Sequence, residues 1–226
     1  MSWWKKLWPA SQASGPPEVV QRVRFSISGW EEREPSGRMR VWSGSHGSVL
    51  SLSALGKGEW PATPTESEAQ HQARLLAMDR GGGLIEAETL TCSMGTAVCL
   101  IYKRLQMPAY VYTGMFIVPA RGGFLVWTIV AGECGTTGVR EAVVTAELMN
   151  AGRFGIQEYE RLWARDPYDP TYAGVDRSVL RFISDDESYD NRFPEHPLSR
   201  VRQVMAEVRN WIQSNPQAGR QNLGKE

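Results

Sequence analysis

A cysteine in a glycine-rich turn is the residue best placed for chemistry in this sequence. Cys134 stands in GECGTTGVREA, directly before a predicted helix. A thiol near a helix N-terminus can have a lowered pKa and act as a nucleophile, and the free N–H groups of such a turn can bind an anion. A cysteine enzyme also needs a base, and the histidines are distant in sequence: His46, His71 and His196. A small buried cysteine at a strand end is favoured, and catalysis by Cys134 stays an alternative.

The stretch SDDESYDNRFPEHPLSRVRQ, from Ser184 to Gln203, concentrates acids, a histidine and arginines. An acid–base site here would need two carboxylates, or His196 and a carboxylate, directed into a cleft. A structural interpretation is simpler, because Ser184 and Glu187 have the spacing of a capping box at the start of a helix. The stretch therefore predicts a junction between two helices rather than an active site.

The residues after His196 predict a last helix with one apolar face. That face consists of Leu198, Val201, Met205, Val208 and Ile212. Its solvent-exposed sides are expected to carry Arg200, Arg202 and Arg209. An ion pair between an arginine and Asp185 or Glu195 would hold the two helices together.

Charge, motifs and cysteine usage exclude several classes of function. The chain has 25 Lys+Arg against 25 Asp+Glu, so it lacks the basic surface of a nucleic-acid binder. The sequence contains no HExxH, CxxC, EF-hand or phosphate-loop motif, so neither a metal site nor a cofactor is expected. Its 3 cysteines do not form a disulfide framework and favour a reducing, cytoplasmic location.

The first residues, MSWWKKLWPA, carry tryptophans at helical spacing with two lysines among them. Trp3, Trp4 and Trp8 could touch a membrane, since tryptophan favours the interface and lysine favours anionic lipid. So short a helix binds membranes weakly on its own, and packing on the protein's own surface is favoured. A peripheral protein at the inner membrane face stays an alternative. No apolar run is long enough to span a bilayer.

Aromatic residues gather around the proline-rich loop DPYDPTYAG in the last third of the chain. They are Trp163, Tyr168, Tyr172 and Tyr189. Exposed aromatic side chains of this kind mark partner-binding sites. The other interpretation, which we favour slightly, is that they hold the C-terminal section on the rest of the chain, because so long a loop needs anchoring.

Local patterns predict an α+β fold with an antiparallel meander sheet. Three strands are expected before the first helix: Val19–Trp30, Met39–Trp42 and Ser48–Leu52. Four more follow in succession with short turns between them: Leu84–Thr91, Thr96–Leu105, Tyr110–Val118 and Gly123–Val130. Such short breaks favour antiparallel pairing over βαβ crossovers. Two helices, Thr65–Arg80 and Val139–Asn150, are expected to lie against this sheet.

The chain divides into four parts by composition and pattern. Residues 1–17 form a Trp/Lys segment and linker, residues 18–152 the sheet domain, residues 153–213 a helical C-terminal extension packed on it, and residues 214–226 a polar tail. The extension is expected to contain a short helix, Ile156–Ala164, and a strand, Ser178–Ile183.

Four stretches resemble the Mog1/PsbP-like group of folds. They are VRFSISGW, RMRVWSGSHGSVLSL, TAVCLIYKRL and GECGTTGVREAVVTAELM, and they span residues 18–150. The resemblance implies an antiparallel sheet flanked by helices. It also implies work by binding: a GTPase partner, a photosystem subunit or, in bacterial members, a secreted effector held by its chaperone. No binding residue of the group carries over to this chain.

The sequence therefore favours a non-enzymatic domain that binds another protein, as an adaptor or a chaperone. Two alternatives stay open: an enzyme that uses Cys134, and a peripheral membrane protein anchored by its N-terminal tryptophans. Thiol reactivity separates the first alternative from the protein-binding hypothesis, and liposome binding tests the second.

Overall fold

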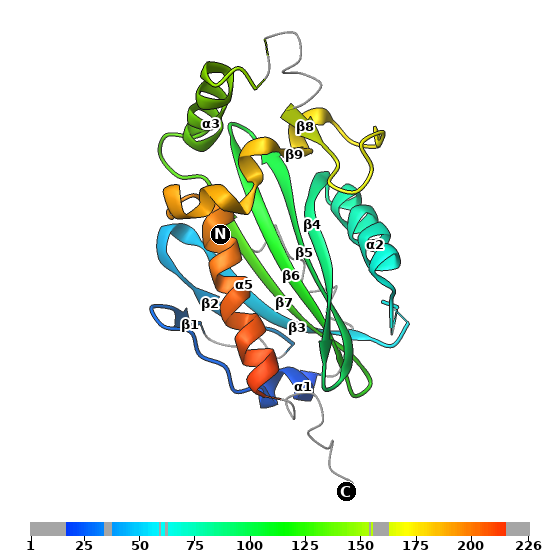
Figure 1. The fold of residues 1–226 in the computed structure, drawn as a ribbon. Helices are drawn as coiled ribbons and strands as arrows, with labels where there is room; N and C mark the ends of the chain where they lie inside the picture. Colours follow the sequence, from blue (N-terminus) through cyan, green and yellow to red (C-terminus); the bar gives the residue numbers. More distant parts are fainter. Residues whose placement is uncertain are drawn as a thin grey trace, which may run out of the picture.

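Helices cover both faces of one antiparallel sheet (Figure 1). The computed structural model describes residues 17–33, 38–58, 60, 61, 63–153, 155 and 163–215. The sheet has 7 strands in the order β1-β2-β3-β7-β6-β5-β4. Their bounds are β1 Glu31–Glu32, β2 Arg40–Ser43, β3 Val49–Gly56, β4 Gly82–Cys92, β5 Gly95–Gln106, β6 Ala109–Ala120 and β7 Gly123–Gly132. The predicted α+β class and the antiparallel meander from β4 to β7 are confirmed.

One face of the sheet is covered by α2, Glu66–Asp79. The predicted capping box is present, since Thr65 Oγ1 accepts from the Glu68 N–H and the Glu68 carboxylate accepts from the Thr65 N–H. Three alanines of α2, at spacing four, are fully buried: Ala69, Ala73 and Ala77. Small side chains on this stripe let the helix approach β4 and β5 closely.

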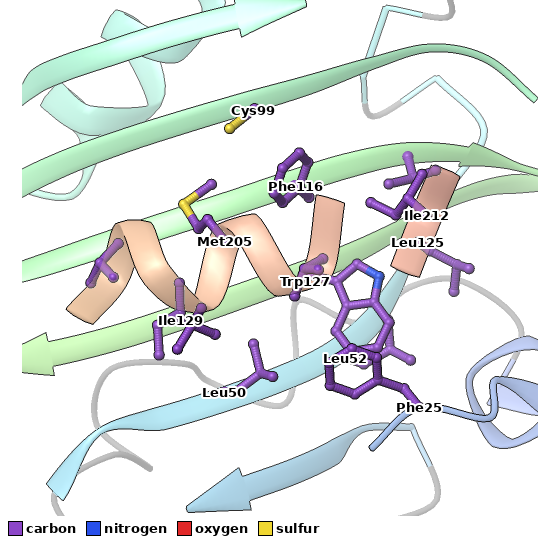
Figure 2. Packing of buried hydrophobic residues seen from close by; sticks show 14 of the residues in the cluster. Phe25, Leu50, Leu52, Cys99, Phe116, Leu125, Trp127, Ile129, Met205 and Ile212 are labelled. Carbon is purple, nitrogen blue, oxygen red and sulfur yellow. The ribbon is translucent and has the colours of Figure 1, made fainter. Parts of the chain in front are cut away.

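The other face carries the larger core, beneath α5, Pro197–Ser214. The predicted apolar face of this last helix is confirmed, because all five of its residues are buried: Leu198, Val201, Met205, Val208 and Ile212. Figure 2 shows Met205 and Ile212 of this helix beside strands of the sheet, with Phe25 next to Trp127, their rings tilted to each other. The rings of Phe25, Trp42 and Trp127 lie 4.5 to 5.7 Å apart. Such aromatic packing adds to the burial of apolar area.

The expected strand Val19–Trp30 is wrong. The chain forms a short helix, α1 Pro17–Arg22, followed by extended backbone without a strand partner. The alternation in the sequence does predict which side chains are buried, since Val23 and Phe25 both lie in the core. The backbone carbonyls there are bound by side chains, however. Arg40 donates to the Val23 carbonyl, and Trp211 Nε1 donates to the Arg24 carbonyl at 3.0 Å.

The helix α3 has its predicted bounds, Val139–Asn150, but it does not cover the sheet. It lies beyond the end of the sheet where β5 turns into β6 (Figure 1) and contacts the C-terminal segment instead. Val144 packs there with Trp163, Leu180 and Phe182. The expectation that this helix lies on the sheet is therefore wrong, because its buried side chain packs against residues of a segment distant in sequence.

The segment before α5 contains little regular structure. It holds a small antiparallel pair, β8 Ala164–Arg165 and β9 Arg181–Phe182, and three 3-10 turns: η4 Arg177–Val179, η5 Ile183–Asp185 and η6 Glu187–Arg192. The expected strand Ser178–Ile183 shrinks to β9. Most of the expected helix Ile156–Ala164 lies outside the described residues, and its last residue begins β8.

The predicted tryptophan contacts with a membrane also fall outside the described residues, since Trp3, Trp4 and Trp8 belong to residues 1–16. Among the described residues, no helix combines the length and the apolar character needed to cross a bilayer.

A glycine in the centre of β6 sets how closely α5 approaches the sheet. A Cβ at Gly114 would lie 2.2 Å from Met205 Sδ, 2.8 Å from Val201 Cγ1 and 2.9 Å from Ile129 Cγ2. Gly114→Ala should therefore destabilise the protein by about 1–3 kcal/mol through overpacking. Urea unfolding followed by tryptophan fluorescence measures this loss. Gly155→Ala is the control, because a Cβ there meets nothing within 4 Å; equal stability of both variants would contradict the close packing.

Candidate functional site

A buried ion pair anchors the C-terminal segment to the end of the sheet. Lys103 of β5 and Asp185 of η5 have no exposed side-chain surface, and Lys103 Nζ lies 2.6 Å from Asp185 Oδ2. The Asp185 carboxylate also accepts from the Phe182 N–H at 2.8 Å. The Lys103 ammonium group lies over the Phe182 ring, with Nζ 3.1 Å from the ring centroid. Burial lowers the pKa of Lys103, and the Asp185 carboxylate acts in the opposite direction.

Arg140 joins α3 to the same segment. Its side chain is fully buried and donates hydrogen bonds to two backbone carbonyls, those of Ser184 and Asp186, at 2.6 and 2.9 Å. It also donates to Asp190 and to the Ser199 hydroxyl, both at 2.9 Å. All three nitrogens of the guanidinium group are thus used, which is how a buried arginine avoids a large desolvation cost.

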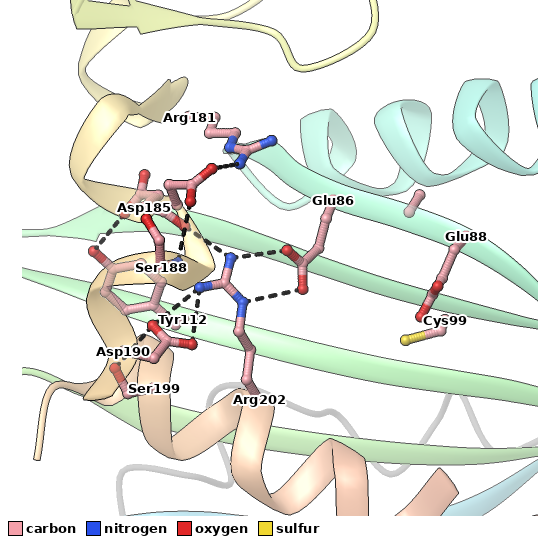
Figure 3. A network of polar contacts seen from close by, with 12 residues as sticks. Glu86, Glu88, Cys99, Tyr112, Arg181, Asp185, Ser188, Asp190, Ser199 and Arg202 are labelled. Atoms are coloured by element: carbon pink, nitrogen blue, oxygen red, sulfur yellow. Dashed lines mark hydrogen bonds and ion pairs between the residues drawn. The ribbon is translucent and has the colours of Figure 1, made fainter. Parts of the chain in front are cut away.

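Arg202 of α5 makes the third set of anchors (Figure 3). It donates to both oxygens of Glu86 on β4, at 2.8 and 3.2 Å, and to the Asp185 carbonyl at 2.8 Å. Asp190 accepts from it at 3.1 and 3.2 Å. Burial lowers the pKa of Arg202, but the hydrogen bonds and charges of Glu86 and Asp190 outweigh it, so the pKa is raised.

An open groove of about 690 Å³ runs beside these anchors, between α5, η6 and the strands β4 and β5. We call it the α5 groove. Its charged lining consists of Glu86, Glu88, Asp186, Glu187, Asp190, Arg202 and Arg209. Arg209 pairs with Glu88, and Arg181 pairs with Asp186 at 3.1 Å. Most of its charged side chains are thus held in fixed positions before any partner binds.

A second cavity of about 370 Å³ lies on the other side of the η6–α5 junction. It brings together several residues that the sequence singled out: His46, Cys134, Glu195 and His196. Its other polar lining residues are Glu133, Thr136, Arg140, Arg192 and Arg200. Glu195 pairs with His46 at 3.2 Å, not with an arginine as expected.

Cys134 is exposed, not buried as expected, and its thiol contacts carbonyl groups. Its Sγ lies 3.5 Å from the His46 carbonyl and 3.7 Å from the Gly132 carbonyl. The helix α3 begins five residues later, and the Gly138 N–H at its start donates to the Glu133 carboxylate at 2.8 Å. A carboxylate of the same loop therefore takes the position expected for a bound anion. Among the described residues, no contact places a base on this thiol.

His196 serves mainly as a structural residue at the start of α5. Its Nδ1 accepts from the Leu198 N–H at 3.3 Å, and its ring packs edge-on against Tyr112 with 5.3 Å between centroids. Burial, followed by the nearby Arg140 charge, lowers the pKa of His196 to about 3. So weakly basic an imidazole would deprotonate a thiol poorly at neutral pH.

The structural interpretation of the stretch from Ser184 to Gln203 holds in outline but not in detail. The capping box of Ser184 and Glu187 is wrong, because the chain forms two 3-10 turns and Asp186 caps the second by accepting from the Ser188 N–H. Asp185 pairs with a lysine rather than an arginine. Two arginines expected on the solvent-exposed sides of the last helix are largely buried.

Those two residues are Arg202, described above, and Arg200. Arg200 donates to the Ser48 hydroxyl at 3.0 Å and to the carbonyls of Ser45 and Gly132 at 3.2 and 3.3 Å. Its place one turn into α5 brings it against the β2–β3 hairpin and the end of β7. Helical periodicity predicts that Arg200 lies on a solvent-exposed side of α5. In the fold, that side of the helix packs against the β2–β3 hairpin and the end of β7.

The four aromatic residues singled out by the sequence make contacts within the chain. Trp163 is buried and stacks on Phe182. The Tyr168 hydroxyl accepts from the Ala87 N–H at 2.6 Å and donates to the Ala87 carbonyl at 2.7 Å, which satisfies both backbone groups of one residue of the edge strand β4. Tyr172 lies against Arg74, and Tyr189 against Arg192. Their role in partner binding stays a prediction.

Sequence reasoning missed the residues that organise this region. Lys103, Arg140, Glu133 and Glu141 were given no role, although a lysine at the end of the apolar run AVCLIY is a usable signal. A charged residue that continues the buried alternation of a strand requires a partner. The partner itself lies 82 positions later, so local patterns could not name it.

No protein-family model and none of the curated proteins matches the chain. A solved structure, the Saccharomyces cerevisiae Ran-binding protein Mog1p, has 11% identity and a TM-score of 0.40, covering 54% of this chain and 76% of that one. A mutant of protein Mog1 has 13% identity and a TM-score of 0.37, covering 54% and 75%.

The buried ion pair predicts strongly coupled substitutions. Lys103→Met leaves the Asp185 carboxylate buried without its counter-ion and should cost about 3–5 kcal/mol of unfolding free energy. In the double variant, Lys103→Met with Asp185→Asn, the loss of unfolding free energy should be at least about 2 kcal/mol smaller than the sum of the losses in the two single variants. Urea denaturation of the four proteins measures this coupling.

The exposed pair of Arg33 and Glu31 provides the control for this cycle. Arg33→Met should change stability by no more than about 0.5 kcal/mol. Additive losses in the Lys103 and Asp185 cycle would show that the pair does not anchor the segment.

The three thiols should react in an order set by exposure. Cys134 is exposed, Cys92 is half-buried, and burial raises the pKa of Cys99 far above its usual value. Iodoacetamide at pH 8 should therefore label Cys134 first, at the rate of an ordinary free thiol, and Cys99 only after unfolding. Mass spectrometry of timed samples reads the order. Labelling of Cys134 about a hundredfold faster than glutathione would instead support the enzyme alternative.

Proposed function

We propose that this chain is a protein-binding domain that holds a basic segment of its partner in the α5 groove. The proposal rests mainly on one feature, the ordered charged lining of that groove. Five carboxylates and two guanidinium groups line it, which leaves an excess of negative charge on its surface. Arg140 and Arg181, which lie outside the groove lining, offset part of this excess through ion pairs with Asp190 and Asp186, and Glu187 is exposed.

A partner segment rich in lysine and arginine complements this surface. Charge complementarity speeds association and selects partners, more than it adds raw affinity. The fixed positions of Glu86, Asp190 and Arg202 lower the entropy lost on binding, because these side chains are already ordered by their ion pairs. The groove is open along its length and is bounded by a rigid helix and a sheet edge.

This mode of binding suits an adaptor, or a chaperone that holds a basic segment of a client protein. Tyr189 belongs to η6, as do the groove residues Ser188 and Asp190, so one of the four predicted aromatic contacts lies beside the proposed surface. Its side chain is half-buried, and its ring lies against the Arg192 guanidinium group.

Two charge reversals of equal size distinguish the effect of the groove on peptide binding from the effect of the protein's net charge. Glu187→Lys changes the groove, whereas Glu207→Lys makes the same change on the solvent-exposed side of α5, outside the groove lining. A fluorescent ten-residue peptide of alternating arginine and glycine serves as the probe, and anisotropy measures its dissociation constant. Glu187→Lys should weaken binding about tenfold, and Glu207→Lys by less than about twofold.

The wild-type affinity should also fall as salt rises, because screening weakens the attraction between exposed charges. Equal effects of the two reversals would remove the groove as the binding surface. Absence of saturable peptide binding to the wild-type protein at low salt would reject a basic partner altogether.

A further inference from the structure

Three metal-ligating side chains from distant parts of the chain converge beside the second cavity. Glu133 follows the end of β7, Glu141 lies in the first turn of α3, and His196 caps α5. One ligand atom from each residue lies within 4.8 Å of the other two. His196 Nε2 and Glu141 Oε1 lie 3.7 Å apart.

Three polar atoms of two of these side chains are buried without hydrogen-bond partners. The His196 side chain is only 8% exposed and that of Glu141 13%. His196 Nε2 and both carboxylate oxygens of Glu141 have no hydrogen-bond partner among the described residues. Buried polar atoms without partners are costly, at about 1–3 kcal/mol for each group. A ligand atom from each of the two residues lies within 4.8 Å of the other and of a Glu133 oxygen, an arrangement that a cation between them would satisfy.

We propose that Glu133, Glu141 and His196 bind one divalent transition-metal ion, with Zn²⁺ as the best-fitting example. Zn²⁺ accepts one imidazole nitrogen and two carboxylate oxygens at about 2.0–2.2 Å. Tetrahedral bonds of that length place ligand atoms about 3.3 Å apart, so small side-chain movements complete the site. Three protein ligands leave a fourth position for water or for a ligand from the 370 Å³ cavity, which Glu133 and His196 both line.

The protonation states suit a metal ion. Burial lowers the pKa of His196 to about 3, so its ring is neutral at pH 7 and no proton has to leave the site from it. Burial raises the pKa of Glu141, and a bound cation would favour its ionised form. Glu133 is already oriented, because its carboxylate accepts from the N–H groups of Tyr110 and Gly138.

Two features act against binding and set its strength. His196 Nδ1 accepts from the Leu198 N–H, so a metal on Nε2 moves the ring proton to Nδ1 and breaks that 3.3 Å hydrogen bond. The charges of Lys103, Arg140 and Arg200 also act on this site. Lys103 and Arg140 are paired with Asp185 and Asp190, which offsets their charges. Arg200 donates to a hydroxyl and to two carbonyl groups, so its positive charge opposes a cation at this site.

Calorimetric titration with ZnCl₂ tests the site directly. The full chain is first treated with EDTA and dialysed, and should then bind one Zn²⁺ per chain. Glu141→Gln keeps the size of the side chain, removes a buried charge and should weaken binding at least about tenfold. Co²⁺ provides a second readout, because its visible absorption reports the coordination of the bound ion and should be lost in the same variant.

His46→Gln is the matched control. His46 lines the same cavity and lies 3.2 Å from an exposed carboxylate, but it is not part of the three-residue cluster. This variant should bind Zn²⁺ as the wild type does, and circular dichroism establishes that both variants are folded. Absence of 1:1 binding by the wild type, or an unchanged affinity in folded Glu141→Gln, would overturn the proposal. Neither result bears on the α5 groove.

Discussion

The position of the C-terminal segment depends on one buried ion pair, between Lys103 and Asp185. Both side chains are removed from solvent, and neither charge would be tolerated there alone. The pair fixes η5 over the end of β5, and the rest of the region is built around that point. Arg140 donates to the carbonyls of Ser184 and Asp186, on either side of Asp185, and Arg202 donates to the carbonyl of Asp185 itself.

These contacts give the region two distinct surfaces. Arg202 and Asp190 form one wall of the α5 groove, whereas His196 and Arg140 line the cavity on the opposite side of the η6–α5 junction. Because both surfaces share the same anchors, they are held by a rigid support rather than by mobile loops. Rigid presentation of charged groups is what binding sites require, whether the bound species is a peptide or an ion.

Much of the fold could be predicted because its signals are local. Short turns between apolar runs predicted the meander from β4 to β7, and a Thr-x-x-Glu spacing predicted the start of α2. The apolar face of α5 followed from helical periodicity alone. The strand expected at Val19–Trp30 shows where this fails. Its alternation of burial is real, but Arg40 and Trp211 bind its carbonyls in place of a neighbouring strand.

The candidate sites could not be predicted in the same way. Glu133 and Glu141 are separated from His196 by more than fifty residues, and no spacing rule links them. Cys134 drew attention because its sequence context is typical of a reactive thiol, whereas the loop carboxylate beside it takes the hydrogen bond that such a thiol would need. The residues of the three-residue cluster come from separate elements that only the fold brings together. The hydrogen bond near Cys134 likewise becomes visible only once the loop is folded.

Native-state hydrogen exchange tests the central claim, that the Lys103–Asp185 pair makes the C-terminal segment one cooperative unit with the sheet. The amides of α5 and of the central strands β5 and β6 should open with the same free energy and the same dependence on denaturant. Exchange of α5 and η6 at a markedly lower free energy, while the strands stay protected, would contradict the account, because the segment would then unfold on its own.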